Sequence, residues 1–297
     1  MSSWLWEDLG NYFGAGASAL SFHENTYSLF FKPGALGSEA KIVKTEPSIA
    51  RLELKNEVTT GPEDSGDQAW VFGSEFSFVQ HVRGTIPAGV LEFSIKGMIP
   101  DPAVFCAELL ESSLKQKGVV FHHQQKAPKE KKIFHITSSP SVEEIVYVTN
   151  QKSINLYAEH LLKQIGVQTS GEGTCASGLS GLKAFLEKKG VPTSGMLLSD
   201  GSGLSQKNLL TARQLTTFLR AMKSSEHFSV FYDSLGEVKP GVKGKSGFNG
   251  LNFAFAGYKG EIAFAIIINH ALDTKASKEK IDSCQMGSAR MRVTSHR

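Results

Sequence analysis

The chain has 297 residues, a length that predicts about two domains at roughly 150 residues each. Its hydrophobic fraction of 40% and charged fraction of 21% are ordinary for a globular protein. The formal net charge of +3 is too small to indicate a nucleic-acid partner, and no apolar run reaches the ~18 residues that a membrane-spanning helix needs. We therefore expect a globular protein with no nucleic acid and no transmembrane segment.

The cysteines and histidines do not form a pattern that binds a metal. Three cysteines are present without paired spacing: Cys106, Cys175 and Cys284. They predict neither a disulfide framework nor a zinc site. We interpret the adjacent pair His122-His123 as structural, because it lacks the spacing of a metal-binding motif. Met1–Asp8 has no basic stretch and no apolar stretch, so we expect no signal peptide in this chain.

Residues from about 20 to 100 have the alternation of β-strands. Arg51–Lys55 and Leu91–Lys96 alternate with period two, and the aromatic-rich run Ala69–Val82 is broken by Gly73. Turn signals such as Pro33-Gly34 separate these runs. The pattern predicts a small, mostly antiparallel β unit with no polar constellation of its own.

A helix is predicted to begin at Asp101-Pro102 and to end at Gly118. Its apolar side is expected to consist of residues at helical spacing: Ala103, Cys106, Ala107, Leu110 and Leu114. A strand is expected at Gly118–Gln124. The basic run Lys126–Lys132 that follows is interpreted as a solvated loop.

The second half of the chain changes to helical periodicity before it ends in strands. Ser141 and Glu144 form a candidate capping box, and a second helix is expected to begin near Ser153. Thr211 and Gln214 are predicted to cap a later helix. Three strands are expected near the C-terminus: Lys243–Phe248, Leu251–Tyr258 and Glu261–Asn269.

Two short motifs in this half are typical of serine acyltransferases that recognise penicillin. Ser153-x-Asn155 lies at the predicted helix junction, and Lys245-Ser246-Gly247 lies on a predicted strand. A lysine on a sheet edge supplies charge for a carboxylate, and a glycine lets a substrate backbone approach the strand. Taken singly, Ser153 could be a helix cap and Lys245 a solvated lysine, so each motif needs support from the other.

A glycine-rich turn lies between these two motifs in chain order: Asp200-Gly201-Ser202-Gly203-Leu204-Ser205. It lacks the first glycine of a Gly-x-Ser-x-Gly nucleophile elbow. We therefore interpret Ser202 as part of a tight structural turn and not as a nucleophile.

Together these segments resemble the class C low-molecular-mass penicillin-binding proteins, which are D-alanyl-D-alanine carboxypeptidases/endopeptidases of the DacB kind. The resemblance rests on the run Ser141–Leu161 and on the signature Asp200–Leu209. Trp6–Ala15 and Gly84–Pro87 are also similar to the family's accessory region. It covers roughly residues 4–282.

The resemblance implies an α/β (α+β) fold. An incomplete β-lactamase/transpeptidase-like serine acyltransferase domain is expected over residues 126–297, beside a β-rich accessory region over residues 1–125. It implies a hydrolase that forms an acyl-serine intermediate on peptidoglycan peptides ending in D-Ala-D-Ala. It also implies β-lactams as inhibitors of the complete enzyme, a periplasmic or cell-envelope location, and neither a cofactor nor a metal.

The same resemblance assigns roles to the motif residues. Ser153 and Asn155 are expected to be catalytic, and Lys245, Ser246 and Gly247 are expected to bind substrate. Ser153 would relay protons, because the family's nucleophile belongs to a separate Ser-x-x-Lys box.

The nucleophile itself is not assigned. In the family, the Ser-x-x-Lys box precedes the accessory region, so its position is expected before Met1. The chain does contain four Ser-x-x-Lys matches: Ser38–Lys41, Ser112–Lys115, Ser180–Lys183 and Ser277–Lys280. Ser112 and Ser180 are expected on polar helix sides, and we expect none of the four to be the nucleophile. Two alternatives to an enzyme stay open: a non-catalytic pseudoenzyme that binds peptidoglycan peptides, and a decayed fragment.

Overall fold

The computed structural model describes residues 3–121, 133, 135–250 and 252–270. Five expectations lie outside the described residues: the domain boundary after residue 125, the His122-His123 pair, the loop Lys126–Lys132, the Ser277–Lys280 match and Cys284. The contacts divide the chain into two units. The first consists of Met1–Val142 and Ile154–Leu161, and the second of Glu143–Ser153 and Leu162–Arg297.

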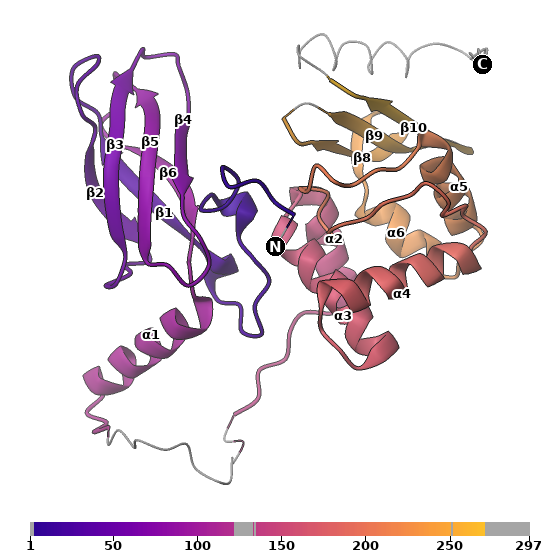
Figure 1. Ribbon diagram of the computed structural model, residues 1–297, viewed down its shortest axis with the longest axis horizontal. Helices are drawn as coiled ribbons and strands as arrows, with labels where there is room; N and C mark the ends of the chain where they lie inside the picture. Colours follow the sequence, from indigo (N-terminus) through magenta and orange to yellow (C-terminus); the bar gives the residue numbers. More distant parts are fainter. Residues whose placement is uncertain (1–2, 122–132, 134, 251, 271–297) are drawn as a thin grey trace. The chain divides into compact units, whose positions relative to one another are not determined.

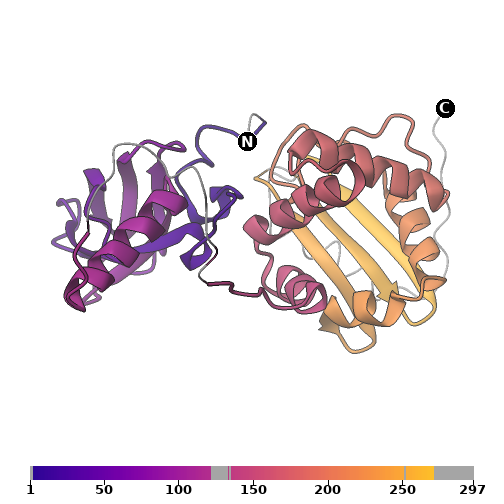
Figure 2. The ribbon, with the colours of Figure 1, turned by 90° about the horizontal axis from the view of Figure 1, so that it is seen from below.

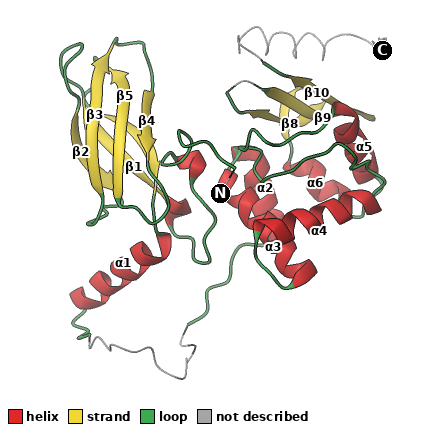
Figure 3. Ribbon diagram, in the orientation of Figure 1, coloured by secondary structure: helices red, strands yellow, loops and turns green. Residues whose placement is uncertain are grey.

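The first unit contains two three-stranded sheets, shown in Figures 1 and 3. One sheet has the order β2-β1-β6 and the other the order β3-β5-β4. Their bounds are Thr26–Lys32 for β1, Lys41–Glu46 for β2, Glu53–Gly61 for β3, Gln68–Phe72 for β4, Val79–Pro87 for β5 and Phe93–Met98 for β6. Short 3-10 turns at Tyr12–Gly14 and His23–Asn25 precede β1.

One apolar core is shared by both sheets of the first unit. Leu29 and Ile95 come from the first sheet, and Val58, Val71 and Val82 come from the second. The prediction of a mostly antiparallel unit is confirmed: of the described strand pairs, β1–β2, β1–β6 and β4–β5 are antiparallel, and β3 and β5 run parallel. β5 lies between β3 and β4, although β4 is the strand that follows β3 in the chain.

Helix α1, Pro102–Gln116, begins where the sequence predicts, because the Asp101 side chain accepts a hydrogen bond from Val104 N at 3.0 Å. The predicted apolar side is wrong, however. Phe105 is buried in the core of the first unit, whereas Leu110 is 53% exposed. The expected strand at Gly118–Gln124 is not seen in its described part, 118–121, which is turn and irregular chain.

The second unit combines helices with an antiparallel sheet (Figure 2). In the described chain it has five helices, and the sheet has four strands in the order β10-β9-β8-β7. Helix α3 is shared with the first unit. The helices are α2 Val142–Lys152, α3 Asn155–Ser170, α4 Cys175–Lys188, α5 Ala212–Lys223 and α6 Phe228–Ser234. The strands are β7 Gly236–Lys239, β8 Val242–Phe248, β9 Phe253–Lys259 and β10 Ile262–Ile268.

Helices α5 and α6 pack on one face of this sheet. Leu219 of α5 and the aromatic side chains of α6 surround Tyr258 of β9, whose hydroxyl donates to Leu219 O at 2.8 Å. The predicted cap of α5 is confirmed, because Thr211 and Gln214 form a capping box. Among the described helices, none combines the length and apolar character needed to cross a membrane.

Candidate active site

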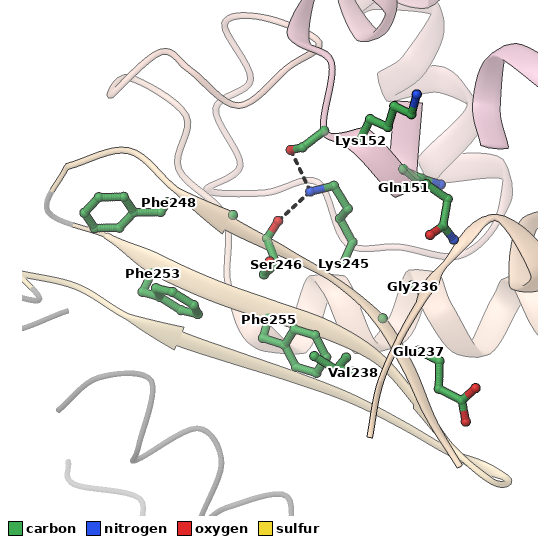
Figure 4. Close-up of a pocket in the computed structure, with 14 residues that line it drawn as sticks. Gln151, Lys152, Gly236, Glu237, Val238, Lys245, Ser246, Phe248, Phe253 and Phe255 are labelled. Carbon is green, nitrogen blue, oxygen red and sulfur yellow. Dashed lines mark hydrogen bonds between the residues drawn. The ribbon is translucent and has the colours of Figure 1, made fainter. Parts of the chain in front are cut away.

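A cleft of about 610 Å³ opens between the end of α2 and the strands β7 and β8 of the second unit (Figure 4). Ser153 lines it from the α2–α3 junction, and Lys245, Ser246 and Gly247 line it from β8. The fold therefore brings together, in one cleft, four of the residues that the two motifs contain.

Lys245 connects the two motifs directly. Its Nζ donates to Ser153 Oγ at 2.8 Å and to the Ser246 carbonyl oxygen at 2.7 Å (Figure 4). Burial lowers the pKa of Lys245 from its ordinary value, because partial removal from water disfavours the charged form. Within the part of the chain that the structure describes, no carboxylate forms an ion pair with Lys245. The cleft thus holds a half-buried cation that an anionic ligand can neutralise.

Lys243 provides a contrast on the same strand. It lies two residues before Lys245, so both side chains point to the same face of the sheet. Lys243 Nζ is 3.2 Å from Asp233 Oδ1 and 4.6 Å from the centre of the Tyr232 ring. The charge of Lys243 is therefore compensated by Asp233 and by the Tyr232 ring.

Ser153 occupies an unusual backbone conformation. It lies between α2 and α3 with φ +55°, in the left-handed region that residues with a Cβ rarely adopt. This turn of the chain ends α2 and presents the hydroxyl to the cleft. Strained backbone of this kind often occurs at functional sites.

Buried Ser234 holds the last turn of α2 in place. Asn150 Nδ2 donates to Ser234 Oγ at 2.8 Å, and Gln151 Nε2 donates to the Ser234 carbonyl oxygen at 2.9 Å. Ser234 Oγ in turn donates to the Phe231 carbonyl oxygen at 2.7 Å. β7 begins two residues after Ser234 and pairs with β8 next to Lys245. Ser234 therefore connects the elements that carry Ser153 and Lys245.

The outer half of β8 leaves one strand edge unpaired in the described chain. β7 pairs with β8 only from Val242 to Gly244, whereas β9 pairs with it from Val242 to Phe248. Lys245–Phe248 therefore offers backbone donors and acceptors along the cleft, in the arrangement that lets an extended peptide add as a further strand.

Two glycines of β8 have different environments. A Cβ on Gly244 would lie 2.7 Å from the Ala256 carbonyl oxygen and 2.8 Å from the Phe255 ring. A Cβ on Gly247 would meet nothing within 4 Å. The described chain gives a packing reason for glycine at 244 and none at 247.

The remaining predicted site residues lie elsewhere. Among the described residues that line the cleft, Asn155 is absent, and its Nδ2 donates to the Phe13 carbonyl oxygen at 2.9 Å within the first unit. The described cleft lining also lacks the turn residues Asp200, Gly201, Ser202 and Gly203.

That turn is organised around the buried carboxylate of Asp200. Asp200 Oδ1 accepts from Gly203 N at 2.9 Å and from Asn208 Nδ2 at 2.7 Å, and Oδ2 accepts from Ser205 N at 2.6 Å. Gly203 has φ +82°, which favours glycine. These bonds fix the loop before α5.

The sequence interpretation did not include the support provided by Asn150, Gln151 and Ser234. Asn150 was available as a signal, since asparagine is unfavourable inside a helix and its side chain needs a hydrogen-bond partner there. Its partner could not be identified, because Ser234 lies 84 residues further along the chain.

Comparison with known proteins gives one family. A model of the D-Ala-D-Ala carboxypeptidase 3 (S13) family matches residues 1–248. A D-alanyl-D-alanine carboxypeptidase of Actinomadura sp. (strain R39) is 27% identical over 305 residues, covering 91% of this chain and 56% of that protein. The D-alanyl-D-alanine carboxypeptidase DacB of Haemophilus influenzae is 21% identical, covering 75% of this chain and 47% of that protein. The chain spans about half the length of these relatives.

A solved structure has the same fold. Penicillin binding protein 4 (dacB) from Haemophilus influenzae superposes with a TM-score of 0.73 and 18% identity, covering 99% of this chain and 67% of that chain. The structure of that protein complexed with a β-lactam gives a TM-score of 0.69 and 17% identity, covering 86% of this chain and 66% of that chain. The likeness confirms the predicted fold class, a transpeptidase-like domain with a β-rich domain.

Proposed function

Because this chain belongs to the D-Ala-D-Ala carboxypeptidase 3 (S13) family, we propose that it serves in the serine-type hydrolysis of peptidoglycan stem peptides that end in D-Ala-D-Ala. The observation that carries the proposal is the hydrogen bond from Lys245 to Ser153 beside the open edge of β8. The location that fits this substrate is the periplasm or cell envelope.

In this proposal the cleft binds the end of the peptide. The backbone of the peptide pairs with the unpaired edge Lys245–Phe248, and its terminal carboxylate is bound by the Lys245 ammonium. Because Lys245 is half-buried and without an ion-pair partner among the described residues, a bound carboxylate removes an unfavourable charge. Gly247 leaves room for the peptide on the same strand.

Ser153 is proposed to move protons during acyl transfer. A separate serine attacks the carbonyl carbon of the D-Ala-D-Ala amide, so that an ester bond forms and the C–N bond breaks. The leaving amine needs a proton, which Ser153 Oγ can pass on because it shares a hydrogen bond with Lys245 Nζ. Water then cleaves the ester and releases the shortened peptide.

The acylating serine is proposed to lie outside the described cleft. The serines in the described lining are Ser153 and Ser246, and neither belongs to a Ser-x-x-Lys match. This observation favours a second candidate function, in which residues 1–297 bind the peptide and do not cleave it. The two functions share the peptide site and differ in covalent chemistry.

Two measurements on residues 1–297 test the proposal. Titration with a peptide ending in D-Ala-D-Ala, followed by NMR, should show binding that Lys245→Ala weakens about 10- to 100-fold, since a hydrogen bond to a charged group contributes about 1.5–3 kcal/mol. Lys243→Ala is the matched control, because Asp233 satisfies Lys243, and it should bind as the wild type does. Equal affinity of the Lys245→Ala variant and the wild type would reject the site.

Incubation with a fluorescent penicillin tests the covalent step. No labelled protein is expected from residues 1–297. A label that disappears in Ser153→Ala would show that Ser153 is the nucleophile, and one that disappears in Ser112→Ala would assign that role to Ser112. Either label would also reject the purely binding function, because it would show that a serine of this chain is acylated.

A further inference from the structure

The first unit has a solvent-exposed sheet face that the proposed function does not use. In the sheet β3-β5-β4, Val58, Val71 and Val82 point into the core and are fully buried. Because side chains alternate along a strand, their neighbours point to the opposite, outer face. Two cross-strand rows lie there: Glu57–Arg83–Trp70 and Lys55–His81–Phe72.

The β4 side of this outer face is aromatic. Trp70 is 43% exposed. The Trp6 ring stacks on Phe72 with centroids 4.9 Å apart and an interplanar angle of 28°, and Trp6 remains 62% exposed. Phe13 contacts Trp70 edge-on, with centroids 6.1 Å apart. The rings are therefore held by neighbours while much of the two indoles stays in contact with water.

The centre of the face is polar, and its charges are compensated. Arg83 donates to Glu57 through Nε and Nη2, at 3.1 Å each. The hydrogen bond from Arg83 lowers the pKa of Glu57, which favours the charged form of this carboxylate. His81 Nδ1 lies 3.6 Å from Glu57 Oε1. The Arg83 guanidinium also lies 6.0 Å from the centre of the Phe72 ring.

Because the charges on this face are balanced, it favours a neutral ligand over a nucleic acid or an anionic membrane. Nucleic acids and anionic membranes need an excess of basic side chains, and Arg83 and Lys55 are each paired with a glutamate, Glu57 and Glu53. A neutral, hydroxyl-rich ligand suits the face better. A pyranose ring has an apolar C–H side that can stack on an indole, and hydroxyls at its rim that can bond to a fixed Arg–Glu pair.

We propose that this outer face, formed by Trp6, Trp70, Phe72, Arg83 and Glu57, binds a linear chain of neutral sugars. The three strands are spaced by about 4.8 Å, so the face is about 10 Å across, wide enough for two sugar rings. Identification of that chain as the glycan strand of peptidoglycan rests on the proposed function, whereas the sugar site itself rests on the face alone. The first unit would then hold the polymer whose peptides enter the cleft of the second.

The probe is a peptide-free β-1,4-linked hexamer of N-acetylglucosamine, titrated into residues 1–297 by calorimetry. Trp70→Ala and Trp6→Ala should each weaken binding about tenfold, as expected for the loss of one aromatic stack. Trp70→Phe keeps a ring and should lose less. The matched control is Phe76→Ala, which removes a ring that is 77% exposed in the β4–β5 loop, and it should not change binding.

Two further measurements separate the outcomes. Lys245→Ala should leave binding of the sugar hexamer unchanged, so failure of the peptide site and failure of the sugar site give different results. Thermal melting verifies that each tryptophan variant is folded. The proposal is overturned if the wild type does not bind the hexamer, or if both alanine variants bind as the wild type does. Self-association in sedimentation that Trp6→Ala abolishes would assign the face to a second copy instead.

Discussion

Lys245 Nζ donates to Ser153 Oγ at 2.8 Å, although the two residues are 92 positions apart in the chain. One comes from a strand and the other from the junction of two helices. Four sets of variants test how the fold maintains this contact and the cleft around it.

The first concerns the charge on Lys245. Burial lowers its pKa below the ordinary 10.5, so the unfolded chain binds this proton more tightly than the native protein does. This contribution to stability is unfavourable at neutral pH, and it diminishes as pH rises from the lowered pKa towards 10.5. Lys245→Met should therefore raise the free energy of unfolding at pH 7. Urea denaturation between pH 7 and 10 measures the effect.

Lys243→Met is the matched control for Lys245→Met. That lysine loses an ion pair with Asp233, so its replacement should not stabilise the protein. If Lys245→Met were the less stable of the two variants at pH 7, the interpretation of Lys245 as an uncompensated cation would be wrong.

The second concerns the backbone of Ser153. The left-handed conformation costs a residue with a Cβ about 1–2 kcal/mol, and glycine avoids most of this cost. Ser153→Gly should therefore be more stable than Ser153→Ala by about 1 kcal/mol, while both lose the hydroxyl. The free energy of unfolding of the two variants gives the comparison.

Lys152, the preceding residue, is the control position. It belongs to α2, where glycine is unfavourable, so Lys152→Gly should be less stable than Lys152→Ala. If the glycine variant were less stable than the alanine variant at position 153 as well, the backbone of Ser153 would not be strained.

The third compares Gly247 with Gly244. Gly247→Ala should change the free energy of unfolding by less than about 0.5 kcal/mol, because its Cβ would meet no neighbour. It should still weaken binding of the D-Ala-D-Ala peptide, because the methyl group would occupy the cleft. Gly244→Ala should cost about 1–3 kcal/mol of stability through its contacts with Ala256 and Phe255. Thermal melting and peptide titration separate the two effects, and unchanged peptide affinity of Gly247→Ala would contradict the proposed position of the peptide.

The fourth removes the hydroxyl of Ser234. Ser234→Ala leaves the Asn150 amide without its acceptor and should cost about 1–3 kcal/mol. Because α2 would then be held less firmly, Lys245 should become more hydrated and its pKa should rise towards the ordinary value. NMR of ¹³Cε-labelled lysine measures this pKa directly.

Ser224→Ala is the control for this variant, since Ser224 is an exposed serine at the end of α5. It should change neither stability nor the pKa of Lys245. A stable Ser234→Ala variant with an unchanged pKa would show that the Asn150–Ser234 contact does not position α2.

Local features of the fold could be predicted from the sequence. The caps at Asp101 and at Thr211 with Gln214 depend on residues three apart, and the structure contains both. The apolar side of α1 could not be identified in this way. Small residues and Leu110 satisfied the helical spacing, but the larger Phe105 ring is the one that enters the core.

Features that depend on distant parts of the chain were beyond prediction from the residues alone. The contact between Asn150 and Ser234 joins two helices, and the parallel pairing of β3 with β5 requires the strand order of the whole sheet. The proximity of Ser153 and Lys245 was expected only through the resemblance to a known family, which supplied the long-range information that periodicity lacks.

The position of β5 between β3 and β4 has a consequence for biosynthesis. The outer strands β3 and β4 are both synthesised before β5, the strand that pairs with each of them. Until Val79–Pro87 has been translated, the backbone N–H and C=O groups that β5 will bond therefore lack their partners. During that interval the aromatic strand Gln68–Phe72 is available to pair with other chains. A nascent chain stalled before residue 79 should therefore require a chaperone, and the synthesis of β5 is the event that ends this vulnerability.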